Sequence, residues 1–308
     1  MRALIAALFL LYGLIGSATA CEVRSVAAAG SLSDYVERAQ ACLDNSPSEF
    51  HFSDEMEGQF IRLINEERER IGLTPVAVRD TMRPAARFHS LDMGVNDFFG
   101  HVSPQGRTPA FRVAAFDRTL VTRATAENVA KIEFKRTCRT ATLETIPCGP
   151  DAKPPRLAAP SDVRELHTRL MNSSVHRKNI LSPNASEAAI GVAVSPEGIY
   201  VTQLFTATVG EFSEPVPVNM VAGDNFAIDI RLSGYRSTRL SLSYNDQVTV
   251  LSRKRLPKNA VEDAAIAVRG ETVTFFRQDG RLNRDARFSS FFSGPRVTLV
   301  ASPEDSGA

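Results

Sequence analysis

The sequence predicts an α+β protein in two parts. Up to about residue 210, amphipathic helical stretches with recognisable caps are joined by turn-rich loops and end in a strand–turn–strand pair. From residue 219 to residue 308, short apolar runs such as FAIDIRL, RLSLSY and TVTFF are separated by turn residues, without helical periodicity. Five or more short strands without helices predict a small all-β, sandwich-like C-terminal domain. The stretch EFSEPVPV, near residues 211–218, is expected to connect the two parts.

Composition narrows the class of protein. The chain has 308 residues, a hydrophobic fraction of 43% and a formal net charge of +1. The length favours one large or two ordinary domains, and the apolar content is sufficient for a core. Nucleic-acid-binding proteins usually carry an excess of basic residues, and this chain does not, so we expect no nucleic-acid partner.

The first twenty residues, MRALIAALFLLYGLIGSATA, have the pattern of a secretory signal peptide. A positive start is followed by an apolar run and by the small-x-small cleavage site Ala18-Thr19-Ala20. The apolar run is shorter than the ~20 residues that a spanning helix needs. We therefore expect cleavage of residues 1–20, a secreted or periplasmic protein, and no transmembrane segment afterwards. Lipid anchoring at Cys21 is disfavoured, because the residue three before it is Ala18 rather than a large aliphatic residue.

The cysteines predict disulfides. An even number of cysteines in an exported chain favours bridges, and none of the spacings is the CxxC of zinc or redox sites. Four cysteines allow three pairings, and proximity in sequence favours the first with the second and the third with the fourth: Cys21, Cys42, Cys138 and Cys148.

The first helices are predicted from their caps. Within an N-terminal extension of residues 21–53, a short helix is expected from about Ser31 to Leu43. A longer helix begins after Ser53 or Asp54 and stops at Gly72.

Two more helices follow the first ones. One is expected from about Asp80 to Met93, with Pro84 tolerated only in its first turn. A shorter helix runs from Thr108-Pro109 to Phe116, with Thr108 as N-cap.

A Pro-rich stretch interrupts the pattern at about residues 135–160, and we expect a surface insertion bridged by Cys138–Cys148. The next helix is expected to begin at Ser161 or Asp162, with Glu165 completing a capping box. Ser174 is expected to cap the short helix that carries HRKNIL. The runs AAIGVAV and IYVTQLFTATV then form a hairpin.

The chain has only five histidines, so their settings are informative. His89 lies on an apolar helix face, which favours a buried, hydrogen-bonded imidazole. His51 and His167 are expected to be solvated. His101, in FFGHVSPQG, and His176, in SSVHRKNIL, lie in irregular stretches.

Five segments in order carry a family resemblance: ARFHSLDM, FFGHVSPQGRTPAFR, AENVA, LMNSSVHRKNILSP and IGVAV…GIYVTQLF. Together they resemble the CAP superfamily of cysteine-rich secretory, antigen 5 and pathogenesis-related proteins, in its bacterial SCP-like branch. The resemblance covers about residues 54–210. It does not cover the extension, the insertion or the C-terminal strands. It implies an α-β-α sandwich, in which an antiparallel sheet lies between helical layers.

The resemblance also implies a surface cavity lined by two histidines and two glutamates. The matching residues here, with the neighbours that complete the cavity, are His101, Glu127, Glu165, His176, Asn128 and Ser103. Two departures affect the cavity mouth: the chain has no Trp, and Val175 stands where a Gly often precedes the second histidine.

Such a site allows three kinds of chemistry. His101 and His176 can bind a divalent metal such as zinc, the residues can transfer protons, or they can simply order the loops. The sequence has no GxSxG or HExxH motif and no cysteine placed as a nucleophile beside a histidine. It therefore favours a binding module for a lipid, glycan or protein at the cell envelope over a metal-dependent or His/Glu-based hydrolase. A scaffolding protein that acts through its β domain is the third possibility.

Overall fold

The computed structural model describes residues 21–27, 29–134, 137–139, 145–147, 158–245, 247–251, 254–278 and 281–302. The predicted signal peptide, and Cys148 of the predicted Cys138–Cys148 bridge, lie outside the described residues. Within these ranges, no helix is long and apolar enough to cross a membrane.

The helices follow the capping signals of the sequence. Ser31, Ser53 and Thr108 each accept a hydrogen bond from the backbone N–H three residues later, as N-caps do. The helical elements are α1 (Val23–Ala27), α2 (Leu32–Asp44), α3 (Asp54–Arg70), the 3₁₀ turn η1 (Asp80–Met82), α4 (Arg83–Val95), α5 (Pro109–Phe116), α6 (Pro160–Asn172) and α7 (Ser174–Ile180).

One predicted helix start was one or two residues late, and one predicted capping residue was wrong by one position. Helix α6 begins at Pro160, and the carboxylate of Asp162, not Glu165, accepts the hydrogen bond from the backbone N–H of Ala159 at 2.8 Å. The residue before α7 is Ser173 rather than Ser174. Proline at the first helical position loses no intrahelical hydrogen bond there, which explains the earlier start of α6.

Three long strands form the centre of the first part of the chain: β3 (Leu120–Glu133), β6 (Glu187–Ser195) and β7 (Gly198–Phe212). They are antiparallel in the order β6-β7-β3, and the predicted hairpin is β6 and β7. The short strands β1 (His51–Phe52) and β2 (Ala77–Val78) pair with β6. Strands β4 (Thr137–Arg139) and β5 (Thr145–Pro147) pair with each other in the insertion.

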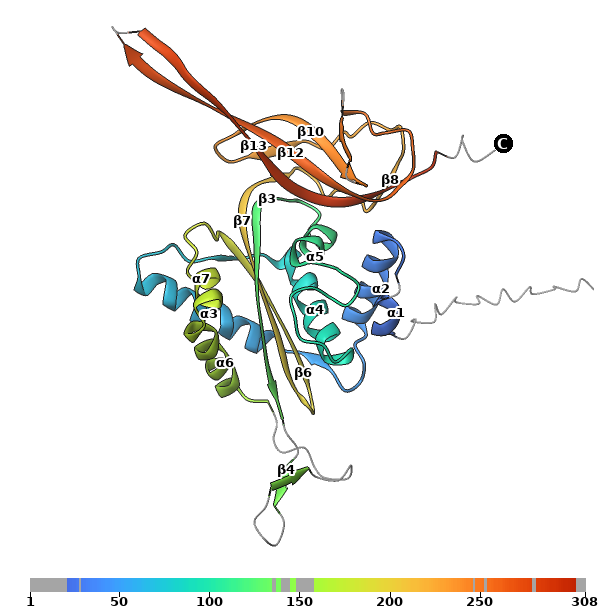
Figure 1. Cartoon of the computed structure of the whole chain (residues 1–308), viewed down its shortest axis with the longest axis vertical. Helices are drawn as coiled ribbons and strands as arrows, with labels where there is room; N and C mark the ends of the chain where they lie inside the picture. Colours follow the sequence, from blue (N-terminus) through green and yellow to red (C-terminus); the bar gives the residue numbers. More distant parts are fainter. Residues whose placement is uncertain are drawn as a thin grey trace, which may run out of the picture.

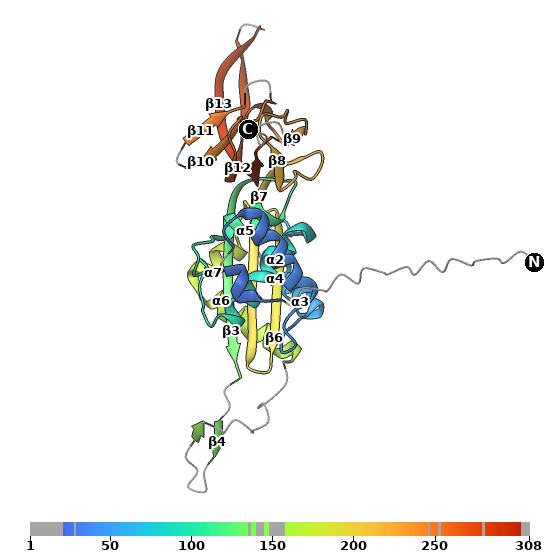
Figure 2. The ribbon, with the colours of Figure 1, turned by 90° about the vertical axis from the view of Figure 1, so that its right-hand side faces the viewer.

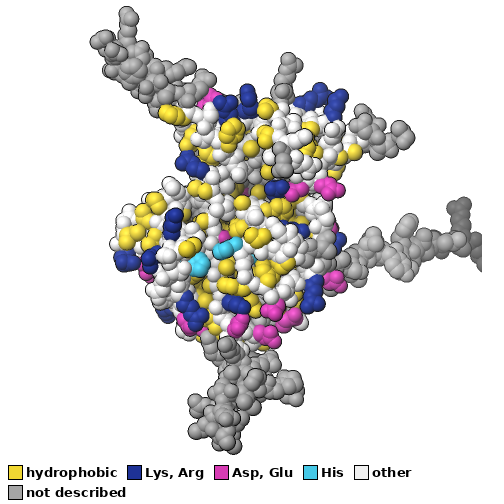
Figure 3. Space-filling view, in the orientation of Figure 1, with side chains coloured by type: hydrophobic (Ala, Val, Ile, Leu, Met, Phe, Trp, Pro, Cys, Tyr) yellow, Lys and Arg dark blue, Asp and Glu magenta, His cyan; other side chains and the backbone are white. Residues whose placement is uncertain are grey.

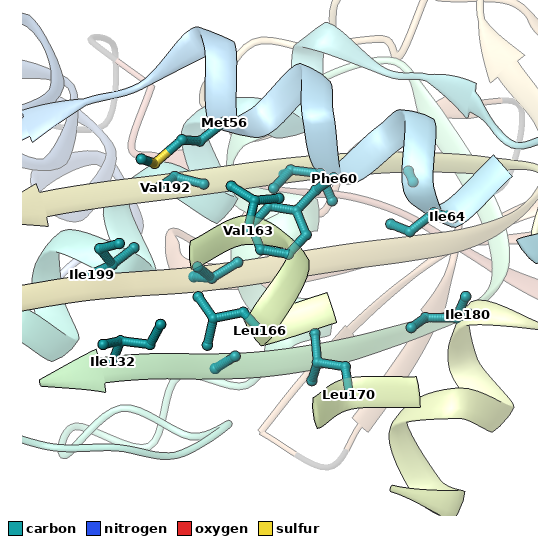
Figure 4. Close-up of a cluster of buried hydrophobic side chains, with 14 of the residues drawn as sticks. Met56, Phe60, Ile64, Ile132, Val163, Leu166, Leu170, Ile180, Val192 and Ile199 are labelled. Atoms are coloured by element: carbon teal, nitrogen blue, oxygen red, sulfur yellow. The ribbon is translucent and has the colours of Figure 1, made fainter. Parts of the chain in front are cut away.

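Helices cover both faces of this sheet. Figure 1 shows α3, α6 and α7 on one side of the strands and α4 and α5, with α1 and α2 outside them, on the other. On the first side, Figure 4 shows Phe60 of α3 and Leu166 of α6 beside the strands of the sheet, in the same apolar core as Ile199. On the other side α4 lies very close to β6, because a Cβ added at Gly191 would come within 2.3 Å of the backbone of Ala86. The first part is thus a three-layer α-β-α structure.

The C-terminal strands do not form a separate sandwich. They are β8 (Asn219–Val221), β9 (Ile230–Leu232), β10 (Arg236–Tyr244), β11 (Gln247–Val250), β12 (Val261–Gln278) and β13 (Arg281–Val300). The hydrogen-bonded sheet continues from β3 to β13, β12, β10 and β11, and β9 pairs with the end of β7. Figures 1 and 2 show these strands stacked at the end of the first part from which β3 and β7 emerge.

The reason for this continuation lies in the ends of β3 and β7. Both strands run past the helices, where Val121, Val209 and Phe212 belong to the same apolar core as Phe226 and Phe292 of the C-terminal part. Open strand edges and apolar side chains at those ends are best covered by further strands. The two parts therefore share a sheet and a core.

Near this junction, a buried arginine connects several elements of the first part of the chain. The guanidinium of Arg79, 7% exposed, forms ion pairs with Asp117, with Glu187 at 3.1 Å and with Glu211 at 2.7 Å. These carboxylates come from the end of α5 and from β6 and β7. One side chain thus ties together three elements that are distant in sequence.

The N-terminal extension is held by a disulfide and by aromatic contacts. Cys21 and Cys42 are bonded, so one predicted bridge is confirmed. Tyr35 of α2 is 2% exposed, and its ring lies 5.9 Å from Phe88 of α4.

Candidate functional site

His101 is the exposed member of a charged cluster. It lies in the loop between α4 and α5, and its Nδ1–H donates to Oε1 of Glu127 at 3.0 Å. The imidazole is 47% exposed, whereas the carboxylate, on the central strand β3, is 1% exposed. The hydrogen bond that His101 donates to Glu127 raises the pKa of His101. It also fixes the ring, so that Nε2 remains available at the surface.

Arg112 is the residue of this cluster that the sequence analysis missed. Its guanidinium is 1% exposed and donates to Oε2 of Glu127 at 2.5 Å. It also donates to the backbone carbonyls of His101, at 3.0 Å, and Arg107, at 2.7 Å. The buried carboxylate is therefore paired, and the loop that carries His101 is fixed to α5. The one signal for this role is a lone arginine inside the apolar helix PAFRVAAF.

His89 lies directly behind His101. It is fully buried, and its Nε2–H donates to the backbone carbonyl of Gly100 at 2.9 Å. Nε2 is 3.9 Å from Oε1 of Glu127. Burial, with the nearby Arg112 charge, lowers the pKa of His89 to about 4. The prediction of a buried, hydrogen-bonded histidine is confirmed.

Asparagine side chains hold α7, and with it His176, against β3. Nδ2 of Asn128 donates to the backbone carbonyl of His176 at 3.2 Å. Nδ2 of Asn179 donates to the carbonyl of Glu127 at 3.1 Å and to Oδ1 of Asn128 at 2.9 Å. The sequence analysis named Asn128 but missed Asn179, the Asn of HRKNIL.

The two surface histidines are electrostatically coupled. Partial burial lowers the pKa of His176, and the neighbouring His101 lowers it further. Figure 3 shows two histidine side chains next to each other on this face, with hydrophobic side chains beside them. At neutral pH His176 is therefore an uncharged imidazole, next to an imidazole that holds its proton more strongly.

Exposed apolar side chains accompany this histidine pair. Phe99 and Val102, on either side of His101 in sequence, are 48% and 50% exposed. Val175, which directly precedes His176, is 66% exposed. The ammonium of Lys131 lies 5.3 Å from the centre of the Phe99 ring. We call Phe99, Val102 and Val175 the apolar rim.

Three residues have surroundings that differ from those predicted from the sequence. Glu165 is half exposed on α6 and pairs with Arg169 one turn along the same helix, so the structure does not bring it into the cluster. Ser103 is 5% exposed, and its hydroxyl accepts a hydrogen bond from the Arg107 backbone N–H at 3.2 Å, which closes the loop. His167 was expected to be solvated but is 6% exposed, because it lies near Glu66 and Glu67 of α3, against which α6 packs; burial lowers its pKa. His51 is exposed, as expected.

The donor set does not fit a zinc ion. In the part of the chain that the structure describes, no three His, Cys, Asp or Glu side chains are arranged to hold a metal. Both carboxylate oxygens of Glu127 are engaged, one by His101 and the other by the permanently charged Arg112. The two imidazoles that remain are fewer than the three protein ligands of a typical zinc site. We therefore assign no metal ion to this site.

The fold and the site define a three-layer protein with a buried carboxylate beneath a surface histidine. A model of the cysteine-rich secretory protein family, CAP, matches residues 61–207. Residues 61–207 are therefore a CAP domain, as the sequence motifs predicted.

A curated bacterial protein is similar in sequence to part of the chain. The uncharacterized protein YkwD of Bacillus subtilis (strain 168) is 31% identical over 149 residues, which are 48% of this chain and 46% of that protein. The chain thus spans about half the length of this curated relative.

Two solved structures are also similar. An outer surface protein of Borrelia burgdorferi covers 51% of this chain and 96% of its own, with 17% identity and a TM-score of 0.38. An extracellular protein containing an SCP domain from Bacillus anthracis strain Ames covers 49% of this chain and 40% of its own, with 24% identity and a TM-score of 0.36.

Proposed function

We propose that the protein is an exported binding module, and that its CAP domain binds an amphipathic ligand at His101 and His176. The observation that carries this proposal is the half-exposed imidazole of His101, held at 3.0 Å by a carboxylate that is itself buried. A ring fixed in this way presents one nitrogen to a ligand without losing further side-chain freedom on binding. His176, on the neighbouring helix, adds a second imidazole.

The chemistry of the surroundings indicates what the ligand contains. The imidazoles offer hydrogen bonds to a polar or anionic head, and His101 favours the anion because its pKa is raised. The apolar rim offers exposed apolar area to a hydrocarbon chain. A lipid-like ligand with an acidic head satisfies both.

Binding is favoured over hydrolysis by the position of Ser103. It is the hydroxyl nearest to His101 in sequence, yet it is buried and accepts a hydrogen bond within its own loop. A serine nucleophile needs its hydroxyl within reach of the base and open to the substrate.

The test uses sodium decanoate as the probe and follows the imidazole resonances of His101 and His176 by NMR. We expect saturable shifts with decanoate and much weaker ones with acetate, which has the same head but no chain. Val175→Ser removes one exposed apolar side chain and should weaken decanoate binding about fivefold, for a loss of roughly 1 kcal/mol of apolar contact.

The matched control is Val248→Ser. Val248 is 67% exposed against 66% for Val175, but it lies on β11 of the C-terminal part. This variant should bind decanoate like the wild type. Equal shifts with acetate and decanoate, or equal weakening by the two valine changes, would contradict the proposal.

One observation favours a second candidate, a hydrolase. A histidine whose Nδ1–H is bonded to a carboxylate has the geometry of a general base, and His101 and Glu127 have it. The substrate would then have to be attacked by water. Hydrolysis of p-nitrophenyl esters that is lost in His101→Gln would support this candidate, and hydrolysis unaffected by the change would exclude it for such esters.

A further inference from the structure

A cavity lies in the C-terminal part, away from the histidines. Its volume is about 770 Å³, and its lining comes from the end of β10, the start of β12 and Arg296 of β13. It is thus built by three adjacent strands of the shared sheet and lies outside the part matched by the family model, residues 61–207.

The cavity is on the side of the sheet opposite the apolar core. Ser243, Ala265 and Arg296 are aligned across the three strands, so their side chains share one face. The adjacent Leu242 and Ile266 point the other way and are almost fully buried. Small side chains at Ser243 and Ala265 leave room on the open face between larger neighbours.

The cavity carries polar groups of several kinds. The guanidinium of Arg296 donates to Asp263 at 2.5 Å and lies 5.0 Å from the ring centre of Phe111 in α5, which fixes its position. Asn245, Asn259 and Glu262 also contribute to the lining and are exposed. Among the described residues, no hydrogen bond or ion pair engages the side chains of these three.

Tyr244 also borders the cavity, but its ring is on the core side of the sheet, like the side chain of Leu242 two residues before it. Tyr244 is partly buried against the core, and its hydroxyl accepts a long hydrogen bond from Thr249 at 3.4 Å. The polar groups of the cavity are thus two amides, two carboxylates and one guanidinium.

We propose that this cavity binds a neutral saccharide. Sugar hydroxyls both donate and accept hydrogen bonds, so they match a mixture of carboxylates, amides and a guanidinium. The two carboxylates outnumber the single cation, so an anionic ligand is disfavoured. Few apolar groups line the cavity, so a lipid is disfavoured as well.

The experiment is an NMR titration of the full chain with maltose, cellobiose, lactose and N,N′-diacetylchitobiose, each taken to millimolar concentration. We expect at least one disaccharide to give saturable shifts of the backbone amides of residues 243–245 and 259–265. Ala265→Leu fills the open face and should weaken that binding about tenfold or more, or roughly 1.4 kcal/mol. Glu262→Gln keeps the shape and should weaken it severalfold.

Two variants are matched controls. Ala77→Leu, at an exposed alanine of β2, is the control for Ala265→Leu. Glu214→Gln, at an exposed glutamate between β7 and β8, is the control for Glu262→Gln. Neither should alter the titration. If Ala265→Leu fails to fold, Glu262→Gln against Glu214→Gln still decides the question. Shifts in these segments with calcium chloride but not with any sugar, or no saturable shift with any disaccharide, would overturn the proposal.

Discussion

Replacing His89 with Gln should make the folded protein less sensitive to acid. The buried imidazole is uncharged, with the proton on Nε2, where it donates to the carbonyl of Gly100 at 2.9 Å. A glutamine amide can reach the same carbonyl but does not titrate. The substitution therefore removes a titrating group while it keeps the hydrogen bond.

The magnitude follows from the two pKa values of His89. In the folded protein burial, with the Arg112 charge, lowers the pKa to about 4, whereas an unfolded chain has a histidine pKa of about 6.5. Between these values the unfolded chain binds more protons, so the free energy of unfolding falls as the pH falls. At about 1.4 kcal/mol for each pH unit, the loss is roughly 3 kcal/mol by about pH 4.

The assay is urea unfolding of both proteins at a series of pH values from about 7 to about 4. Other titrating groups contribute similarly to wild type and variant, so the difference between the curves isolates His89. We expect the variant to gain roughly 3 kcal/mol relative to wild type over this range. His51→Gln, a change at an exposed histidine, is the matched control.

Parallel curves for wild type and His89→Gln would refute the reasoning. They would mean that His89 accepts a proton as easily in the folded protein as in the unfolded chain. A variant that becomes more acid-sensitive would show that the sign is wrong, with Glu127 stabilising a charged His89.

Three further predictions concern stability, measured by urea unfolding. Phe226→Ala empties a fully buried position in the core that both parts share; it should cost roughly 3–5 kcal/mol, and separate unfolding of the two parts would contradict the shared core. Asp117→Asn leaves the buried Arg79 without its closest partner and should cost roughly 3–5 kcal/mol, whereas Asp80→Asn, at an exposed pair, should cost about 1 kcal/mol or less. Cys42→Ser opens a disulfide that joins residues 21 apart in sequence and should cost about 3 kcal/mol, with no further loss on reduction.

The helices were the part of the fold most accessible from sequence. Capping is local, because a Ser or Thr side chain bonds to a backbone N–H only three residues away, and Ser31, Ser53 and Thr108 do so. The central strand β3 was not predicted. Its run LVTRATAENVAKIE lacks regular alternation of apolar and polar residues, because helices cover both faces of the sheet it belongs to.

The site was predicted in part. Family motifs pointed to His101, Glu127 and His176, but Glu165 faces solvent beside Arg169. The spacing of residues along α6 could not reveal that Glu165 faces solvent. Which side of the helix faces solvent depends on the elements against which α6 packs. Arg112 was missed for the same reason, since its partners are a carboxylate on β3 and two loop carbonyls.

The sequence by itself determined the family, the order of the helices and the β6–β7 hairpin, because each depends on residues close together in the chain. Only the tertiary structure decided that β13 pairs with β3, that Arg112 neutralises Glu127, and that the C-terminal strands share a core with the CAP domain. Each of these is a contact between segments distant in sequence. Such contacts depend on which strand edges, buried charges and apolar faces remain to be covered once the local elements have formed.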